Sequence, residues 1–330
     1  MSRIELTVGE IHELVSQSLL ANGCDSANAD AVARTVAAAE RDGAESHGLF
    51  RVPGYVAALR SGRVRGDAQP RVSRKTAAFI HVDADQGFAP LALERGIPVL
   101  AATTRELGVA LMTVTHSFHF AALWPEVEAL AEENLAGIAC VNYAAVMAPH
   151  GGRKAIFGTN PLAFAWPRPE RDPVVADMAT SATARGELML AKRAGRQVPP
   201  GNGLGPDGQP STDPAAILQG VQLPFGGHKG SAIALLVELL AAAATGDSFS
   251  DELNDEVRDG GPPRGGEFVL ALSPEVLAGV EAGQRSEAYL ERFETMPGVR
   301  LPGSRRHARR REQSPRSVDA KLVDKIRSLS

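Results

Sequence analysis

Residues 77–85, AAFIHVDAD, begin a change in the sequence from helical to strand-like patterning. Five similar segments follow: 108–116 (GVALMTVTH), 136–143 (AGIACVNY), 161–167 (PLAFAWP), 172–178 (DPVVADM) and 266–273 (GEFVLALS). Short apolar runs of this kind are typical of strands. Helix-like stretches lie between them at 91–107, 121–133 and 231–244. The alternation predicts an α/β fold with α+β character over residues 76–295.

The preceding residues, 1–75, have helical patterns instead. Thr7 and Glu10 have the spacing of a capping box, and Ser26 is a candidate N-cap for a second helix. We expect a third helix from Ser46 to about Arg60, kinked at Pro53. The basic tail at 296–330 is expected to pack near this N-terminal helical segment. These domain boundaries are approximate.

Composition excludes several classes of protein. The 330 residues are 44% hydrophobic and 22% charged, with a net charge of −4, which gives no indication of a nucleic-acid partner. Cys24 and Cys140 lie far apart, so we expect free thiols in a reducing compartment. The N-terminus lacks an apolar signal segment, and the apolar run 232–244 is too short to span a bilayer. The expected location is the cytoplasm, with no membrane partner.

The segment Ser46-His47-Gly48-Leu49-Phe50-Arg51 carries the sharpest chemical pattern. On a helix, His47 and Arg51 would share one face near its start, where free backbone N–H groups favour an anion. Arg51 could bind a carboxylate through two parallel hydrogen bonds, and His47 could pass a proton to the atom beside the hydride acceptor. Ser46 could orient the imidazole. The alternative is a capping serine beside an ordinary histidine and a surface arginine.

Two further segments could bind phosphate. The glycine-rich run 223–230 ends in His228 and Lys229 at the start of an apolar helix, where backbone N–H groups can receive a phosphate. The run 300–311 is rich in arginine, which suits a phosphate monoester and so favours NADPH over NADH. The alternatives are a tight turn before a core helix and a solvated basic tail.

Other patterns carry less information. Residues 203–208 match GxGxxG but follow no strand, so we expect no Rossmann domain. His116 and His119 are three residues apart with no further ligand at metal spacing, so no metal site is predicted. Asp177 ends an apolar strand, where cofactor-binding groups often lie, although it could equally cap the next turn.

Six segments taken together resemble one family. They are 42–51 (DGAESHGLFR), 119–128 (HFAALWPEVE), 151–161 (GGRKAIFGTNP), 177–187 (DMATSATARGE), 224–230 (PFGGHKG) and 300–303 (RLPG). Their order resembles the malate/L-lactate dehydrogenase-like oxidoreductases, which are unrelated to Rossmann lactate dehydrogenases. Within that family, 119–128 and 224–230 look most like the Δ1-piperideine-2-carboxylate/Δ1-pyrroline-2-carboxylate reductases.

The resemblance implies a non-Rossmann fold that binds NADPH on a largely antiparallel sheet, and a homodimer with the active site near the subunit interface. It implies that Ser46 and His47 are the catalytic relay and proton donor, with Glu187 a further relay member. Arg51 and Thr159 would bind substrate. By the same resemblance, the cofactor-binding residues are His119, Phe120, Ala121, Ala122, Leu123, Asp177, Met178, Ala179, His228, Lys229, Ser304, Arg305, Arg306, His307, Ala308, Arg309 and Arg310.

The implied activity is NADPH-dependent reduction of cyclic imino acids. Δ1-Piperideine-2-carboxylate would give L-pipecolate and Δ1-pyrroline-2-carboxylate would give L-proline, by hydride transfer to C2. One alternative is a 2-hydroxyacid dehydrogenase of the same family, acting on malate, lactate or ureidoglycolate. The other is a non-enzymatic protein that binds an anion through its basic tail.

Overall fold

A seven-stranded sheet forms the centre of the protein. The computed structural model describes residues 2–119, 121–253 and 263–330. In spatial order the strands are β2 (Arg71–Thr76), β3 (Phe79–Asp83), β4 (Val109–Phe118), β11 (Arg264–Leu272), β5 (Ala136–Val141), β6 (Leu162–Trp166) and β7 (Val174–Met178). All six segments that the sequence predicted as strands lie in this sheet, while β2 was not predicted.

All neighbouring strands of this sheet are antiparallel except β3 and β4, which are parallel and are connected by α4 (Ala89–Leu107). A parallel pair needs a crossover of this kind, whereas antiparallel neighbours can be joined by short turns. The predicted mixed α/β fold with a largely antiparallel sheet is confirmed.

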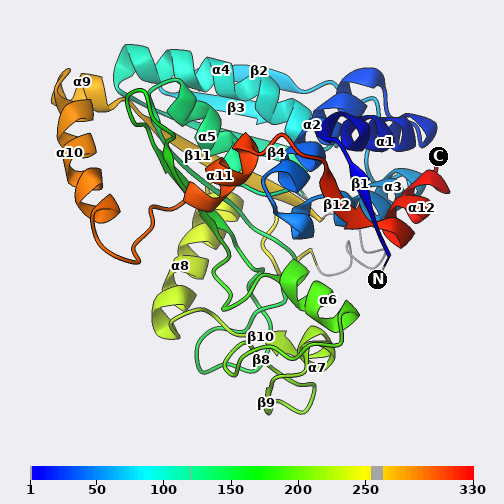
Figure 1. The fold of residues 1–330 in the computed structure, drawn as a ribbon. Coiled ribbons are helices and arrows are strands. Elements are labelled where there is room, and N and C mark those ends of the chain that lie inside the picture. The colour runs from blue at the N-terminus through cyan, green and yellow to red at the C-terminus, as the bar shows by residue number, and fades with distance from the viewer. Residues whose placement is uncertain (1, 120, 254–262) are drawn as a thin grey trace.

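Helices cover both faces of the sheet (Figure 1). α4 and α5 (Trp124–Glu132) pack on one face against the main core, which includes Ala139 and Val269. Their strand neighbours Cys140 and Phe268 contact the opposite layer, formed by α8 (His228–Glu238) and the π-helical turn Leu239–Ala243. Successive strand residues point to opposite faces of the sheet, so alternate positions of one strand contact the two helical layers.

The N-terminal helices α1 (Val8–Ala21), α2 (Ser26–Arg41) and α3 (Val52–Arg60) form a second core beside the sheet. The capping box of Thr7 and Glu10 is confirmed. The predicted N-cap of α2 is wrong by one residue, because the Asp25 carboxylate, not Ser26, accepts from the Asn28 amide.

The third predicted helix begins later than expected. Two 3₁₀ turns, Glu45–His47 and Leu49–Arg51, precede α3. Pro53 therefore lies in the first turn of α3, where its missing N–H costs nothing, and the predicted kink is wrong.

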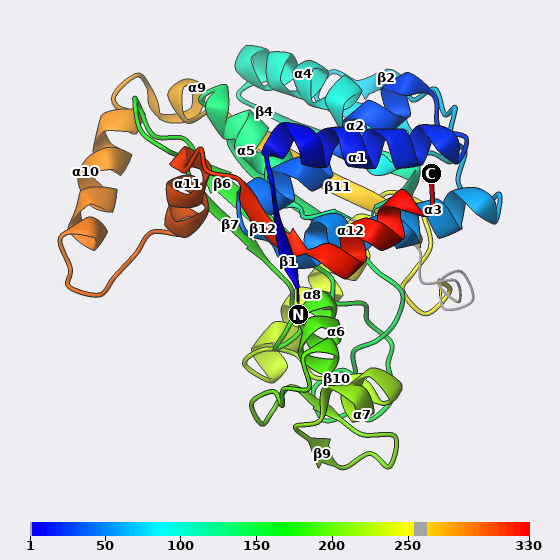
Figure 2. The same cartoon turned by 45° about the vertical axis from the view of Figure 1, so that its right-hand side comes forward.

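The C-terminal tail returns to the N-terminus. β12 (Arg316–Asp319) pairs antiparallel with β1 (Arg3–Leu6), and α12 (Ala320–Arg327) packs on α1. Figures 1 and 2 show the first and last segments of the chain side by side. The arginine-rich run is not a free tail, because most of it forms α11 (Ser304–Arg311), which is held to the fold by the buried His307 and by the pairing of Arg310 with Asp42 and Glu128.

The remaining elements lie at the periphery. α6 (Arg185–Arg193) and α7 (Pro214–Gln219) accompany a small sheet of β10 (Val221–Gln222), β8 (Gly203–Leu204) and β9 (Pro210–Ser211). The residues of the GxGxxG match thus form a strand and a turn, and no helix follows at the spacing that a dinucleotide fold requires. α9 (Pro274–Ala278) and α10 (Ala282–Glu294) extend from the end of β11. None of the helices in the described part of the chain combines the length and hydropathy of a transmembrane segment.

Candidate active site

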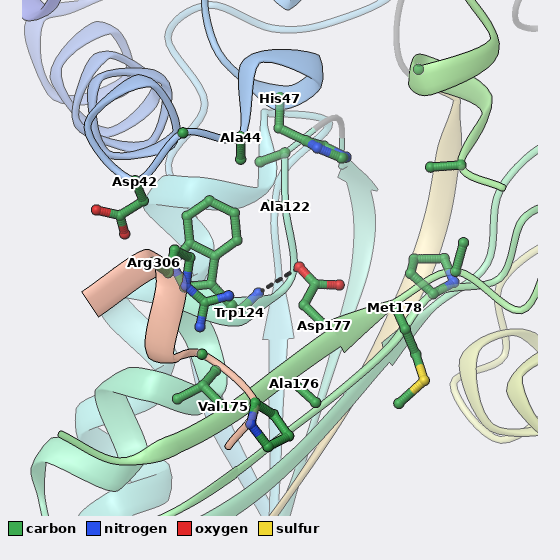
Figure 3. A pocket seen from close by; sticks show the side chains of 18 of the residues that line it. Asp42, Ala44, His47, Ala122, Trp124, Val175, Ala176, Asp177, Met178 and Arg306 are labelled. Atoms are coloured by element: carbon green, nitrogen blue, oxygen red, sulfur yellow. Dashed lines mark hydrogen bonds between the residues drawn. The ribbon is translucent and has the colours of Figure 1, made fainter. Parts of the chain in front are cut away.

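A cavity of about 960 Å³ opens where six parts of the chain meet. Its walls come from the turn at 42–51, the start of α5, the ends of β5 and β7, the start of α6, and residues 300–309. Figure 3 shows side chains from these separate elements directed toward the same space. The sheet thus positions strand ends at the cavity, and the N-terminal and C-terminal segments close it.

A buried carboxylate fixes the turn that carries His47. Glu40 on α2 accepts a hydrogen bond from the Leu49 amide at 2.7 Å. A Cβ at Gly48 would lie only 2.1 Å from Glu40 Oε1, so the turn approaches the carboxylate as closely as glycine alone permits. Burial raises the pKa of Glu40 to about 7.

His47 and Arg51 line the cavity, and the buried Ser46 lies outside its lining beside His47, although no α-helix joins the three residues. Ser46 Oγ is 3.2 Å from His47 Nδ1, close enough to orient the imidazole. Burial, followed by the charges of Arg51 and His119, lowers the pKa of His47 to about 3. The imidazole is therefore uncharged at neutral pH in the ligand-free cavity.

The sequence analysis expected free backbone N–H groups near His47 and Arg51 to favour an anion, and this expectation is wrong. The His47 amide donates to the Ala44 carbonyl oxygen at 2.8 Å, and the Arg51 amide donates to the Gly48 carbonyl oxygen at 2.9 Å. The tight 3₁₀ turns satisfy these donors internally. Recognition of an anion at this wall therefore depends on side chains.

A second guanidinium, missed in the sequence, lines the same cavity. Arg185 at the start of α6 lies in the cavity wall with Arg51 and Tyr143, and burial lowers the pKa of both arginines. Gly186 allows this approach, because a Cβ there would lie 2.9 Å from Ser46 Cβ and 3.2 Å from Arg51 Nη2. In the sequence, Tyr143 could have been found from its place after an apolar strand. Arg185 could have been found from its place two residues before Glu187.

Glu187 lies apart from the imidazole that it was predicted to orient. Its side chain is exposed on α6 and is absent from the cavity lining. Its charge acts on Arg51, whose pKa it raises slightly against the larger effect of burial. Within the described residues, no hydrogen bond joins Glu187 to His47. Thr159, predicted to bind substrate, does line the cavity.

The basic end of the cavity is built around Trp124 and Arg306. The Arg306 guanidinium carbon lies 4.7 Å from the centre of the Trp124 ring. Among the described residues, its buried Nε and Nη2 atoms have no hydrogen-bond partner. A buried donor without a partner is costly, so this group suits an anionic ligand such as a nucleotide phosphate.

Asp177 stabilises the start of α5. Its carboxylate accepts from the Leu123 amide at 2.8 Å and from the Trp124 amide at 3.0 Å. Figure 3 shows the bond between Asp177 and Trp124. The sequence analysis left open a cap of the turn after Asp177, whereas the helix start that Asp177 stabilises lies more than fifty residues earlier in the chain. Asp177, Met178 and Ala179 all line the cavity as well.

The other predicted cofactor residues divide into two groups. Those that line the cavity are His119, Ala121, Ala122, Ser304, Arg305, Arg306 and Arg309. Those that lie outside its lining are Leu123, His228, Lys229, His307, Ala308 and Arg310. Phe120 lies outside the described residues.

The second group has other surroundings. His307 Nε2 is 3.1 Å from the Pro173 carbonyl oxygen, and Arg310 donates to Asp42 and Glu128 at 2.6 Å each. Leu123 is in the hydrophobic core. His228 and Lys229 are exposed at the first turn of α8.

His119 contacts two buried carboxylates behind the cavity wall. Its Nε2 lies 3.4 Å from Glu126 Oε1 and 3.8 Å from Glu267 Oε2. His116, which the sequence placed beside it, pairs with Asp83 at 3.0 Å instead. The sequence analysis missed both glutamates, although Glu267 was visible as a charge inside an apolar strand.

Comparison with known proteins assigns the family. The model of the family described as "Malate/L-lactate dehydrogenase" matches residues 6–327. The chain belongs to this family.

Similar proteins include several reductases. The chain is 47% identical over 303 residues to a Δ1-pyrroline-2-carboxylate/Δ1-piperideine-2-carboxylate reductase of Pseudomonas putida, covering 91% of this chain and 89% of the relative. It is 44% identical over 332 residues to a Δ1-pyrroline-2-carboxylate reductase of Ancylobacter novellus, covering 99% and 97%. The crystal structure of Δ1-piperideine-2-carboxylate reductase from Pseudomonas syringae pv. tomato superposes with a TM-score of 0.94 at 40% identity, covering 99% of this chain and 100% of that one.

The charge state of His47 gives the first prediction. In the ligand-free protein, the His47 imidazole should remain uncharged as the pH falls through 6.5 and gain a proton only near pH 3. NMR of protein labelled in the histidine rings, with the resonance assigned through His47→Asn, measures this directly. A midpoint near 6.5 would contradict the burial and electrostatic argument.

Proposed function

We propose that this protein is an NADPH-dependent reductase of cyclic imino acids, reducing Δ1-pyrroline-2-carboxylate to L-proline and Δ1-piperideine-2-carboxylate to L-pipecolate. The observation that carries the proposal is the placement of Arg51 beside the His47 imidazole on one cavity wall. The substrate needs both groups, because it bears a carboxylate next to the C=N carbon and takes up a proton at nitrogen. The reductases to which the chain is similar act on these same two compounds by name.

The substrate carboxylate binds to Arg51, with Arg185 and Thr159 on the same cavity lining. A bidentate pair with a guanidinium fixes the plane of the carboxylate and therefore the face of the ring. Binding also offsets the charge of Arg51, which is the second cause, after burial, of the lowered pKa of His47. His47, oriented by Ser46, passes a proton to the ring nitrogen.

The residues of the basic wall fit a phosphate-bearing cofactor. Arg306, Arg305 and Arg309 lie on α11 at the cavity, and Arg306 offers donors that its described neighbours leave unused. Three arginines suit the additional phosphate that distinguishes NADPH from NADH. The cofactor supplies the hydride. Ala121, Ala122, Met178 and Ala179 present small or apolar surface between this wall and His47.

The proposed reductase is a homodimer. α8 and the π-helical turn that follows it expose Leu235, Leu236 and Leu239, each 49% exposed, at i, i+1 and i+4. An apolar helix stripe of this kind suits a subunit interface. His228 and Lys229 begin the same helix and lie outside the cavity of their own chain, so we place them toward the partner's cofactor. Two buried free thiols suit a cytoplasmic location.

The two alternatives differ in their support. A 2-hydroxyacid dehydrogenase would use the same Arg51 and His47, and the sulfolactate dehydrogenase of Methanocaldococcus jannaschii shares the fold at a TM-score of 0.89, with 26% identity over 99% of this chain and 96% of that one. The interpretation of the basic tail as a free anion-binding segment is weakened, because Arg310 pairs with the buried carboxylates of Asp42 and Glu128.

A paired-substrate assay tests the function. We expect the purified protein to oxidise NADPH with Δ1-pyrroline-2-carboxylate and Δ1-piperideine-2-carboxylate, and far more slowly with pyruvate or oxaloacetate. The assay records absorbance loss of the cofactor for each substrate with NADPH and with NADH. Reduction of the keto acids alone would contradict the imino-acid proposal and favour the dehydrogenase.

Arg51→Ala should lower kcat/KM for the imino acids by about 10²–10³-fold. Losing one partner of a desolvated charge pair costs roughly 3–5 kcal/mol, at about 1.4 kcal/mol per tenfold. Steady-state kinetics measure the change. Arg105→Ala is the matched control, because it removes only an exposed pair with Glu133 and should leave kcat/KM within about twofold. A loss below tenfold in Arg51→Ala would mean that Arg51 does not contact substrate.

Arg306→Glu should weaken NADPH binding much more than NADH binding, since the reversed charge repels the additional phosphate. Isothermal titration of both cofactors measures the ratio of dissociation constants. Arg311→Glu is the control, because Arg311 already pairs with Asp172 outside the cavity. Equal weakening of NADPH and NADH by Arg306→Glu would contradict this role.

A further inference from the structure

A buried triad of ionisable groups lies behind the cavity wall. His119 lines the cavity, while Glu126 on α5 and Glu267 on β11 approach its Nε2 from the core side, at 3.4 and 3.8 Å. Their side chains are only 6%, 5% and 1% exposed. Carboxylates buried to this degree are rare unless they are paired.

The backbone is shaped to place Glu267 there. β11 has an irregularity between Gly265 and Glu267 in its pairing with β4, and such bulges redirect a side chain. Gly266 lies inside this irregularity, where a Cβ would be 2.1 Å from the Ala241 carbonyl oxygen. Within the described residues, neither Glu267 oxygen has a hydrogen-bond partner. The imidazole of His119 is therefore its main electrostatic partner.

The charged groups around the triad come from several elements. Asp177 at the end of β7 and the two glutamates raise the pKa of His119, against the opposing effect of burial. His47 lines the same cavity, and the charge of His119 is the third cause, after burial and Arg51, that lowers the pKa of His47. Cys140 on β5 and Tyr55 on α3 are the remaining titratable neighbours, facing Glu267 and Glu126 respectively.

We propose that Glu267 and Glu126 are positioning residues that hold a proton on the His119 imidazole, and that this imidazole stores the proton consumed by the reduction. The inference rests on the proposed reductase function. It assigns the two histidines of the cavity complementary states, with His119 charged and His47 neutral. Neither glutamate needs to touch substrate or cofactor.

The proton balance follows directly. As hydride reaches the carbon of the C=N bond, the π pair of that bond becomes a lone pair on nitrogen. An N–H bond forms there as the neutral His47 gives up its ring N–H proton, and in the same step its other ring nitrogen takes a proton from the His119 imidazolium, so that His47 is neutral before and after. His119 is left neutral beside the two carboxylates and recovers a proton from solvent. Each turnover consumes one hydride and one proton.

Glu267→Gln tests the proposal by removing one negative charge with little change of shape. An opposite charge within about 4–6 Å shifts a pKa by roughly 1–3 units, so the His119 titration should fall by about that amount. Since His119 acts in its protonated form, the alkaline limb of the kcat/KM profile should move to lower pH by the same amount. Histidine-ring NMR of the full-length protein, assigned through His119→Asn, and the pH profile with Δ1-pyrroline-2-carboxylate and NADPH measure the two shifts. Glu126→Gln should shift both quantities in the same direction and serves if Glu267→Gln folds poorly.

Glu238→Gln is the matched control. Glu238 is also buried, but it accepts from Asn160 and Ser250 and does not contact the triad. It should lower the melting temperature without moving either titration. The proposal would be overturned if, in both triad variants, neither the midpoint of the His119 titration nor the alkaline limb of the kcat/KM profile moved. Stoichiometric zinc in the purified protein with loss of activity on chelation would also overturn it, because the triad would then be a metal site.

The two readouts separate this inference from the function on which it rests. If the wild-type protein reduces no imino acid, the proposed function fails while the NMR titration of His119 still tests the triad. If reduction proceeds and only the titration shifts are missing, the triad proposal alone fails.

Discussion

The central constraint is the cost of taking Arg51 and His47 out of water on one wall of the cavity. Burial lowers the pKa of both groups, which shows that each loses solvation in its charged form. The rest of the structure holds them there in spite of this cost. Glu40 fixes the turn through the Leu49 amide, and the glycines at 48 and 186 let α2 and α6 approach it. A carboxylate ligand would offset the unfavourable charge that this arrangement creates.

The two histidines of this cavity consequently differ in how strongly each holds a proton. Burial and then the nearby charges of Arg51 and His119 lower the pKa of His47, whereas the carboxylates behind His119 raise its pKa in spite of burial. Different environments thus give one residue type two functions within a single site. Both states depend on distant parts of the chain, since Glu267 belongs to the central strand of the sheet and Arg51 precedes the third helix.

The sequence predicted what depends on local pattern. Alternating and apolar runs located six strands, and the order of six short segments indicated the family. It failed where tertiary contacts decide. Gly48 and Pro53 together replaced a predicted helical start with 3₁₀ turns, because the chain must bend to reach Glu40. The basic run at 304–311 looked like a possible solvated tail, but its carboxylate partners Asp42 and Glu128 lie far away in the sequence.

The same limit applies to the site. Glu267 could be seen as a charge inside an apolar strand, but no local pattern relates it to His119, because about 150 residues separate them. Arg185 lay beside a residue that the family resemblance already singled out, and only the fold shows which of the two faces the cavity.

The most direct test of the central claim is a crystal structure with NADPH and pyrrole-2-carboxylate, a planar analogue that is not reduced. The account predicts that both carboxylate oxygens lie within hydrogen-bond distance of the Arg51 guanidinium, with the ring nitrogen facing His47. A carboxylate bound elsewhere in the cavity, or a ring nitrogen turned away from His47, would contradict it.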